Sequence, residues 1–172
     1  MTPDDRELLD FYVARGRAGR ERSLEAMWVE HELRSFVLAR LPARRPLAVC
    51  NVGIGSGGWD DWLALAVGAS ITSIDRDARA CRMLVLRQLR EHHPLPSLVI
   101  CGDARDGVLG RARYDVITAV GEHADGGATR RALLDAIVPG GVLLGAEVGD
   151  GAAADHVVAR GDVWVACQAR TR

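Results

Sequence analysis

Lysine is absent from this sequence, although the chain is not poor in basic side chains. All 22 basic residues are arginines. Schiff-base catalysis needs a lysine amine, and the P-loop of nucleoside triphosphatases needs a lysine beside the phosphates. The composition therefore excludes both chemistries.

An excess of one charge and a long apolar run are also missing. The net charge is −1 and the isoelectric point is near 6.5, so the composition offers no electrostatic argument for a nucleic-acid or membrane partner. No apolar run approaches the roughly 18 residues of a membrane span, and the N-terminus lacks the basic and apolar regions of a signal peptide. We expect a cytoplasmic protein with no nucleic-acid and no membrane partner.

Cysteine is scarce and forms no motif. The four cysteines, at positions 50, 81, 101 and 167, lack a C-x-x-C spacing and fall within predicted strands or a predicted helix. This pattern is typical of small buried side chains rather than of a disulfide framework or a zinc site. We expect no metal centre.

The most informative segment is residues 47–58, in which an apolar run breaks into four glycines. An amphipathic run follows at 59–67 and stops at Gly68, so the segment predicts a strand, a tight turn and a helix. Glycines at 53, 55 and 57 or 58 let the backbone approach a ligand closely, and the helix N-terminus offers unpaired N–H groups. A nucleotide-like ligand is expected across this turn.

The turn alone does not choose the ligand. Gly53, Gly55 and Gly58 fit the dinucleotide pattern G-x-G-x-x-G, whereas a third glycine at 57 fits G-x-G-x-G. Asp75 ends the next strand-like run, about 20 residues on, where a carboxylate can accept hydrogen bonds from ribose hydroxyls of either ligand. The rest of the chain favours the pattern G-x-G-x-G. About 40 residues precede the first predicted strand, and little more than about 60 follow the third predicted strand. A nicotinamide dehydrogenase usually needs more chain, but NAD stays open as the alternative.

Four ordered features resemble class I, Rossmann-like S-adenosylmethionine-dependent methyltransferases. They are the glycine-rich first motif at 49–57, the acidic strand end Ile-Asp-Arg at 74–76, the Gly-Asp-Ala loop at 102–104 and the Val-Pro-Gly-Gly-Val turn at 138–142. The resemblance covers most of residues 43–172. The family often has an acidic residue where Asn51 stands, so contacts to the methionine end of the cofactor depart from the family pattern.

This resemblance implies S-adenosylmethionine as the cofactor and S-adenosylhomocysteine as the product. Asp103 would accept from the adenine amino group, and the Ala104 N–H would meet a ring nitrogen. The cofactor-binding residues that it implies are Asn51, Gly53, Gly55, Gly57, Asp75, Arg76, Asp103, Ala104 and Val120.

The predicted fold is α/β: a doubly wound, mostly parallel seven-stranded sheet with an N-terminal helical cap. Residues 1–42 form the cap, with helices at 3–14 and from Ser23 to about Pro42, and residues 43–172 form the Rossmann-like core. Residues 156–160 and 163–169 alternate as two strands of a hairpin. By analogy with the family, Tyr12, Trp28 and His31 of the cap would face the substrate; the alternative is that they pack in the core.

Candidate catalytic residues follow the predicted fourth strand, at 114–121. Ligands of open α/β sheets bind beyond the carboxyl ends of the strands, so Glu122 and His123 should face the transferred methyl. His123 titrates nearest neutral pH and is the candidate base; Glu122 could orient it or hold a substrate amine. The alternative is that they are ordinary polar loop residues.

We expect methylation of a small-molecule acceptor at O, N or C. The Asn/Asp-Pro-Pro-Tyr/Phe signature of base-modifying amino methyltransferases is absent, which disfavours adenine-N6 and glutamine acceptors. The Ala-rich, Arg-only composition resembles that of high-GC bacteria, where such enzymes often serve natural-product biosynthesis.

Two alternatives remain: a non-methylating use of the cofactor in displacement or cyclisation, and a non-catalytic cofactor-binding partner protein. Because the C-terminal part is short, the cap or a second subunit of a homodimer must close the site.

Overall fold

A computed structural model of the chain describes residues 2–20, 31, 34–35, 37–39, 41–43, 46–119, 127–145, 156–160 and 163–169. Its centre is a seven-stranded sheet with the strand order β3-β2-β1-β4-β5-β7-β6. The strands are β1 (Ala48–Val52), β2 (Ser70–Asp75), β3 (Leu98–Cys101), β4 (Tyr114–Ala119), β5 (Ile137–Gly145), β6 (His156–Arg160) and β7 (Val163–Ala169). The predicted strand number is confirmed.

Strands β1 to β5 pair in parallel, whereas β7 runs antiparallel to both β5 and β6. The helices are α1 (Pro3–Arg20), α3 (Gly58–Val67), α4 (Ala78–Arg90) and α5 (Gly127–Ala136), with a 3₁₀ turn η1 (Ala104–Asp106) after β3. From β1 the chain winds through β2 to β3, and it then crosses to β4 on the other side of β1. The doubly wound α/β fold expected from the sequence is confirmed, and its switch point lies between β1 and β4.

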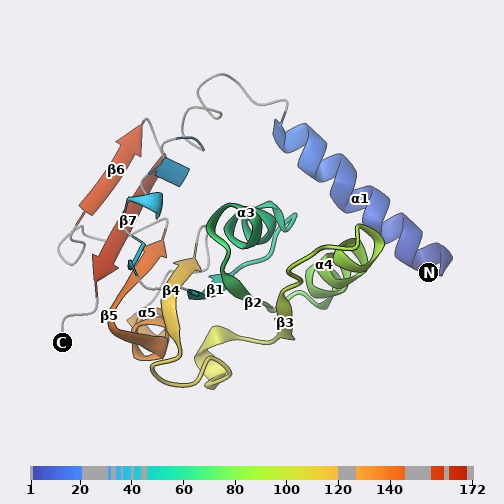
Figure 1. Cartoon of the computed structure of the whole chain (residues 1–172). Coiled ribbons are helices and arrows are strands. Elements are labelled where there is room, and N and C mark those ends of the chain that lie inside the picture. Colours follow the sequence, from blue (N-terminus) through green and yellow to red (C-terminus); the bar gives the residue numbers. More distant parts are fainter. Residues whose placement is uncertain are drawn as a thin grey trace.

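Helices cover both faces of the sheet (Figure 1). Leu63 and Ala64 of α3 pack on alternate residues of the inner strands, including Val49 and Val116. On the opposite face, Leu133 of α5 packs with a second set of strand residues. This alternation is that of a parallel strand buried on both sides.

Helix α1 packs against α4 and the glycine turn rather than against the sheet (Figure 1). Leu8, Leu9 and Tyr12 form a buried cluster with residues of α4 and with Ile54. The N-terminal helix therefore borders the segment on which the site is built.

Helix α1 is longer than the sequence predicted. It continues through Gly16 and Gly19 to Arg20, so the prediction that it ends at residue 14 was wrong. A glycine costs a helix only about 1 kcal/mol, and Arg17 and Ala18, which lie between these two glycines, are strong helix formers. In the predicted second cap helix, residues 31, 34, 35, 37 and 38 are helical, and Ser23 lies outside the described residues.

The predicted turn at 138–142 was wrong, because β5 begins at Ile137 and includes these residues. Two other boundaries agree closely with the sequence. Asp77 caps α4, its side chain accepting from the Arg79 N–H at 2.8 Å. Gly68 ends α3 in the left-handed conformation, with a φ of 66°. Local chemistry thus sets most element ends.

Candidate functional site

A pocket lies at the carboxyl ends of the first strands. It holds about 120 Å³ and is lined by Val52, Gly53, Ile74, Asp75, Arg76, Gly102, Asp103, Ala104, Arg105 and Thr129. These residues come from the ends of β1 and β2, the segment after β3 and the start of α5. This edge, beside the β1/β4 switch point, is where open α/β sheets bind ligands.

The glycine turn borders the pocket, which Gly53 lines. Gly53, Gly55 and Gly57 have φ values of 88°, 55° and 76°, in the left-handed region that favours glycine. The Gly53 N–H donates to the Ile74 carbonyl at 2.9 Å, and the Gly57 N–H donates to the Ile54 carbonyl at 2.8 Å. Three left-handed glycines therefore fold the backbone tightly beside β2.

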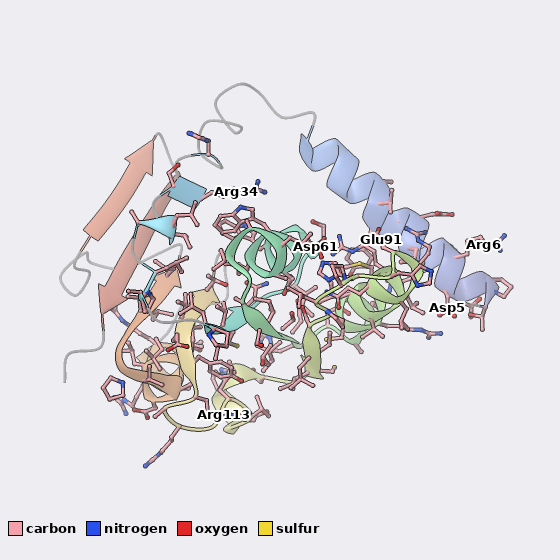
Figure 2. The ribbon with its side chains drawn as sticks, viewed as in Figure 1. Asp5, Arg6, Arg34, Asp61, Glu91 and Arg113 are labelled. Carbon is pink, nitrogen blue, oxygen red and sulfur yellow. The ribbon has the colours of Figure 1, made fainter. Side chains whose placement is uncertain are left out.

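Gly57 is also required by packing. A Cβ on this residue would lie 2.6 Å from Arg87 Nη2 and 2.8 Å from Leu84 Cδ1. Arg87 Nη2 donates to the Gly57 carbonyl at 3.1 Å and to Asp61 Oδ1 at 2.8 Å. Asp61, on α3, lies toward α4 (Figure 2), so this arginine ties the turn and α3 to α4.

Asp75 connects the glycine turn to the second strand. Its Oδ2 accepts from the Ile54 N–H at 2.8 Å, and its Oδ1 accepts from the Asp77 N–H at 2.9 Å. A carboxylate can accept about four hydrogen bonds. Because each oxygen has one partner here, about two acceptor positions are left for a pair of hydroxyl groups.

Asp103 is held by its neighbour two residues on. Arg105 Nε and Nη2 donate to its two oxygens at 2.9 and 2.6 Å, and the Arg105 N–H donates at 2.9 Å. Arg76 Nη1 lies 3.7 Å from Asp103 Oδ2. Hydrogen bonds from Arg105 hold the pKa of the Asp103 carboxyl well below its usual range. One further donor, such as an amino group, can still be accepted.

Asn51 lies beneath the turn in a buried polar network. Its Nδ2 donates to Asp60 Oδ2 at 3.1 Å and to the Gly53 carbonyl at 3.2 Å, and its Oδ1 accepts from Thr118 Oγ1 at 2.8 Å. Ser73 Oγ donates to the other Asp60 oxygen at 2.5 Å. The network joins β1, β2, β4 and α3 beneath the glycine turn. Both the Nδ2 and the Oδ1 atom of the Asn51 side chain therefore have hydrogen-bond partners within the protein.

The pKa of the Asp60 carboxyl is raised to about 6. Burial raises it, and the hydrogen bonds from Ser73 and Asn51 offset part of this effect. Its place in the first turn of α3 would by itself suggest only that Asp60 suits the positive end of the helix dipole. That interpretation is incomplete, because the side chain is fully buried. Nothing in the local sequence signals the partners at positions 51 and 73.

The pocket brings together five of the predicted cofactor-binding residues: Gly53, Asp75, Arg76, Asp103 and Ala104. Of the other five lining residues, Val52, Ile74 and Gly102 belong to the predicted motifs, whereas Arg105 and Thr129 were missed. Arg105 follows the Gly-Asp-Ala loop directly, and its charge beside Asp103 was the available signal. Thr129 comes from a distant helix and gives no such signal.

Two of the predicted substrate contacts, Tyr12 and His31, fall within the described residues, and neither lines this pocket. Tyr12 is buried between α1 and α4, and its hydroxyl donates to Asp77 Oδ2 at 3.4 Å. His31 is exposed. Four other candidates lie outside the described residues: the substrate contact Trp28, the cofactor-binding residue Val120, and the catalytic residues Glu122 and His123.

The described residues contain no group of three histidine, cysteine or acidic side chains that could hold a metal ion. In the same part of the chain, every helix is too short or too polar to cross a membrane.

Comparison with known proteins places the fold. No protein-family model and no curated protein sequence matches the chain. Among solved structures, it matches a SAM-dependent methyltransferase from Thiobacillus denitrificans in complex with S-adenosyl-L-homocysteine, with 27% identity and a TM-score of 0.55. The match covers 67% of this chain and 48% of that one.

Two more distant matches share the fold alone. The putative methyltransferase yhhF from Escherichia coli has 15% identity and a TM-score of 0.64, over 87% of this chain and 88% of that one. The [4+2]-cyclase SpnF has 19% identity and a TM-score of 0.59, over 67% of this chain and 44% of that one. The chain spans less than half the length of several proteins that it matches. The resemblance inferred from the sequence is nevertheless confirmed: the chain has the class I, Rossmann-like methyltransferase fold and is similar to SAM-dependent methyltransferases.

Proposed function

We propose that this chain binds S-adenosylmethionine in the pocket beside the glycine turn and transfers its methyl group to a small-molecule acceptor. The observation that carries the proposal is the convergence of the left-handed glycine turn, Asp75 and the Asp103–Ala104 loop at one sheet edge. The similarity to a methyltransferase with S-adenosyl-L-homocysteine in its structure supports it.

The acceptor capacity of the two carboxylates suits an adenosyl group. Asp75 has about two positions left, which match the two ribose hydroxyls, and Asp103 has about one, which matches the adenine amino group. Arg105 holds the Asp103 carboxylate in place from the solvent side. Ala104 also lines the pocket, and its backbone N–H is proposed to meet a ring nitrogen of the adenine, as the family resemblance implies.

S-adenosylmethionine supplies a methyl carbon made electrophilic by its sulfonium. The chain must hold the acceptor in line with that carbon, and it must take up the acceptor's proton where there is one. His123 is proposed as the base and Glu122 as the residue that orients it. Tyr12, Trp28 and His31 are proposed as substrate contacts. A cytoplasmic setting, a biosynthetic role and closure of the site by a homodimer belong to the same proposal.

A second candidate is a non-methylating use of the cofactor. The fold match to a [4+2]-cyclase favours keeping this candidate, because one fold supports both chemistries. Product analysis separates the two. Methyl transfer converts S-adenosylmethionine into S-adenosylhomocysteine, whereas a bound electrostatic aid to cyclisation leaves it unchanged. A non-catalytic binding protein would bind the cofactor and give neither product.

Calorimetric titration with S-adenosylmethionine, S-adenosylhomocysteine and NAD tests the proposal first. We expect a Kd in the micromolar range for the adenosyl ligands, about −8 kcal/mol, and weaker binding of NAD. Asp75→Ala should weaken binding roughly 10- to 100-fold, since a hydrogen bond to a charged group contributes about 1.5–3 kcal/mol.

Asp106→Ala is the matched control. It also removes a carboxylate near the pocket, but Asp106 is exposed and does not line it. Thermal melts of both variants establish that they remain folded. Preference for NAD, or equal losses in the two variants, would overturn the proposal.

A further inference from the structure

Two cysteines face each other at the outer end of the sheet. Cys101 is the last residue of β3, and its Cα pairs with that of Asp75 on β2. Val99, two residues earlier on the same face of β3, packs against the cluster that contains Cys81 of α4. Because side chains alternate along a strand, the Cys101 side chain points to the same side as Val99, toward α4.

The Cys81 sulfur lies directly over this strand end. Its Sγ is 3.5 Å from the Asp75 carbonyl oxygen and 3.7 Å from the Ile100 carbonyl oxygen. Ile100 directly precedes Cys101, so this contact places the Cys81 sulfur next to the backbone of Cys101.

The two thiols differ in exposure. Cys101 is exposed, whereas Cys81 is buried. Burial, followed by the nearby Cys101, raises the pKa of the Cys81 thiol to about 12. An oxidant in solvent therefore meets Cys101 first, and Cys81 is placed to react second.

We propose that Cys81 and Cys101 form a reversible dithiol–disulfide pair, oxidised by low-molecular-weight disulfides. The Cys101 thiolate attacks one sulfur of the small disulfide, forming a mixed disulfide and releasing one small thiol. Cys81, after losing its proton to water, attacks the Cys101 sulfur and displaces the second small thiol. The protein loses two electrons and two protons, and the small disulfide gains them as two thiols.

This modification site borders the pocket. Cys101 precedes Gly102 and Asp103, which line it, and the Gly102 N–H donates at 2.9 Å to the same Asp75 carbonyl that accepts from Cys81. The disulfide would tie α4 to the base of the Gly-Asp-Ala loop. The proposal does not depend on which ligand the pocket takes.

The test is incubation of the folded full chain with oxidised glutathione, followed by intact mass and tryptic mapping. We expect loss of two hydrogens and a linked pair of peptides, 80–82 with 91–105. A Cys50→Ala/Cys167→Ala variant, which keeps only this pair, should form the same bond.

Single variants separate the two steps. Cys81→Ser should retain one glutathione on Cys101, because the resolving thiol is gone, and Cys101→Ser should form no internal bond at Cys81. Thermal melts of each variant establish folding. A wild-type protein that stays fully reduced, that stops at the glutathione adduct or that links another pair would overturn the proposal.

Discussion

The environment of Asp60 differs from the one that its local sequence suggests. It lies in the first turn of α3, where an exposed acid would suit the helix dipole, yet it is fully buried. It accepts from Ser73 and Asn51 and so links β1 and β2 to α3. Since Asn51 also donates to the Gly53 carbonyl, the carboxyl group supports the glycine turn through its neighbour.

The raised pKa of Asp60 gives a prediction for stability against pH. The pKa is about 6 in the folded protein and near 3.8 when unfolded, so the folded state binds the proton more tightly between these values. The free energy of unfolding should therefore fall as pH rises through this window, by on the order of 2–3 kcal/mol. Urea unfolding of wild type and Asp60→Asn at about pH 4 and about pH 7 measures the difference.

Asp60→Asn should lack this dependence, because its amide does not ionise. Ser73→Ala offers a second check: loss of a hydrogen bond that lowers the Asp60 pKa should move the window to higher pH. Parallel pH profiles for wild type and Asp60→Asn would show that Asp60 is not the titrating group.

At the scale of elements, the glycine turn is fixed by contacts with α3 and α4 as well as by its own dihedral angles. Arg87 bridges the turn and Asp61, and its side chain occupies the space where a Cβ on Gly57 would lie. Gly55, by contrast, has open space at that position. The two glycines share a left-handed backbone and differ in packing.

Alanine substitutions at these glycines separate backbone strain from packing. Gly55→Ala should cost about 1 kcal/mol, the cost of a side chain in the left-handed region. Gly57→Ala should cost roughly 2–4 kcal/mol, because Arg87 must also move away from Gly57 and Asp61. Urea midpoints at unchanged m-value measure both, and equal costs would contradict the assigned role of Arg87.

At the scale of the whole molecule, α1 is packed as part of the core. Leu9 is 1% exposed among residues of α4 and the glycine turn, and Asp5 forms an ion pair with Arg82 of α4. The division into a cap at 1–42 and a core at 43–172 remains a prediction. These contacts favour one cooperative unit.

Leu9→Ala should therefore destabilise the entire fold by about 2–5 kcal/mol, the usual cost of such a cavity. Leu89→Ala is the matched control: this leucine of α4 is 68% exposed, and its loss should change stability by less than about 0.5 kcal/mol. Thermal unfolding followed by circular dichroism measures both. A Leu9→Ala protein that melts like wild type would show that α1 is not integral to the core.

The sequence alone determined the elements whose signals are local. The alternation of β6 and β7, the apolar run of β3 and the capping residue Asp77 all depend on neighbours within a few positions. The ordered motifs at residues 49–57, 74–76 and 102–104 located the pocket for the same reason, because each is a strand end followed by a turn. Two features escaped this local reasoning: the length of α1, whose glycines proved tolerable, and the segment 138–142, which is part of β5 rather than a turn.

Tertiary structure decided which of these polar residues face the pocket and which support it. Asn51, Ser73 and Thr118 lie on three different strands, and the strand order β2-β1-β4 places them side by side. The packing of α3 on the sheet then brings Asp60 to Asn51 and Ser73. The same holds for Cys81 and Cys101, and for Gly57 with Arg87. Burial and partner choice depend on how elements stack, and periodicity reports which face of an element is apolar but not which distant side chain it meets.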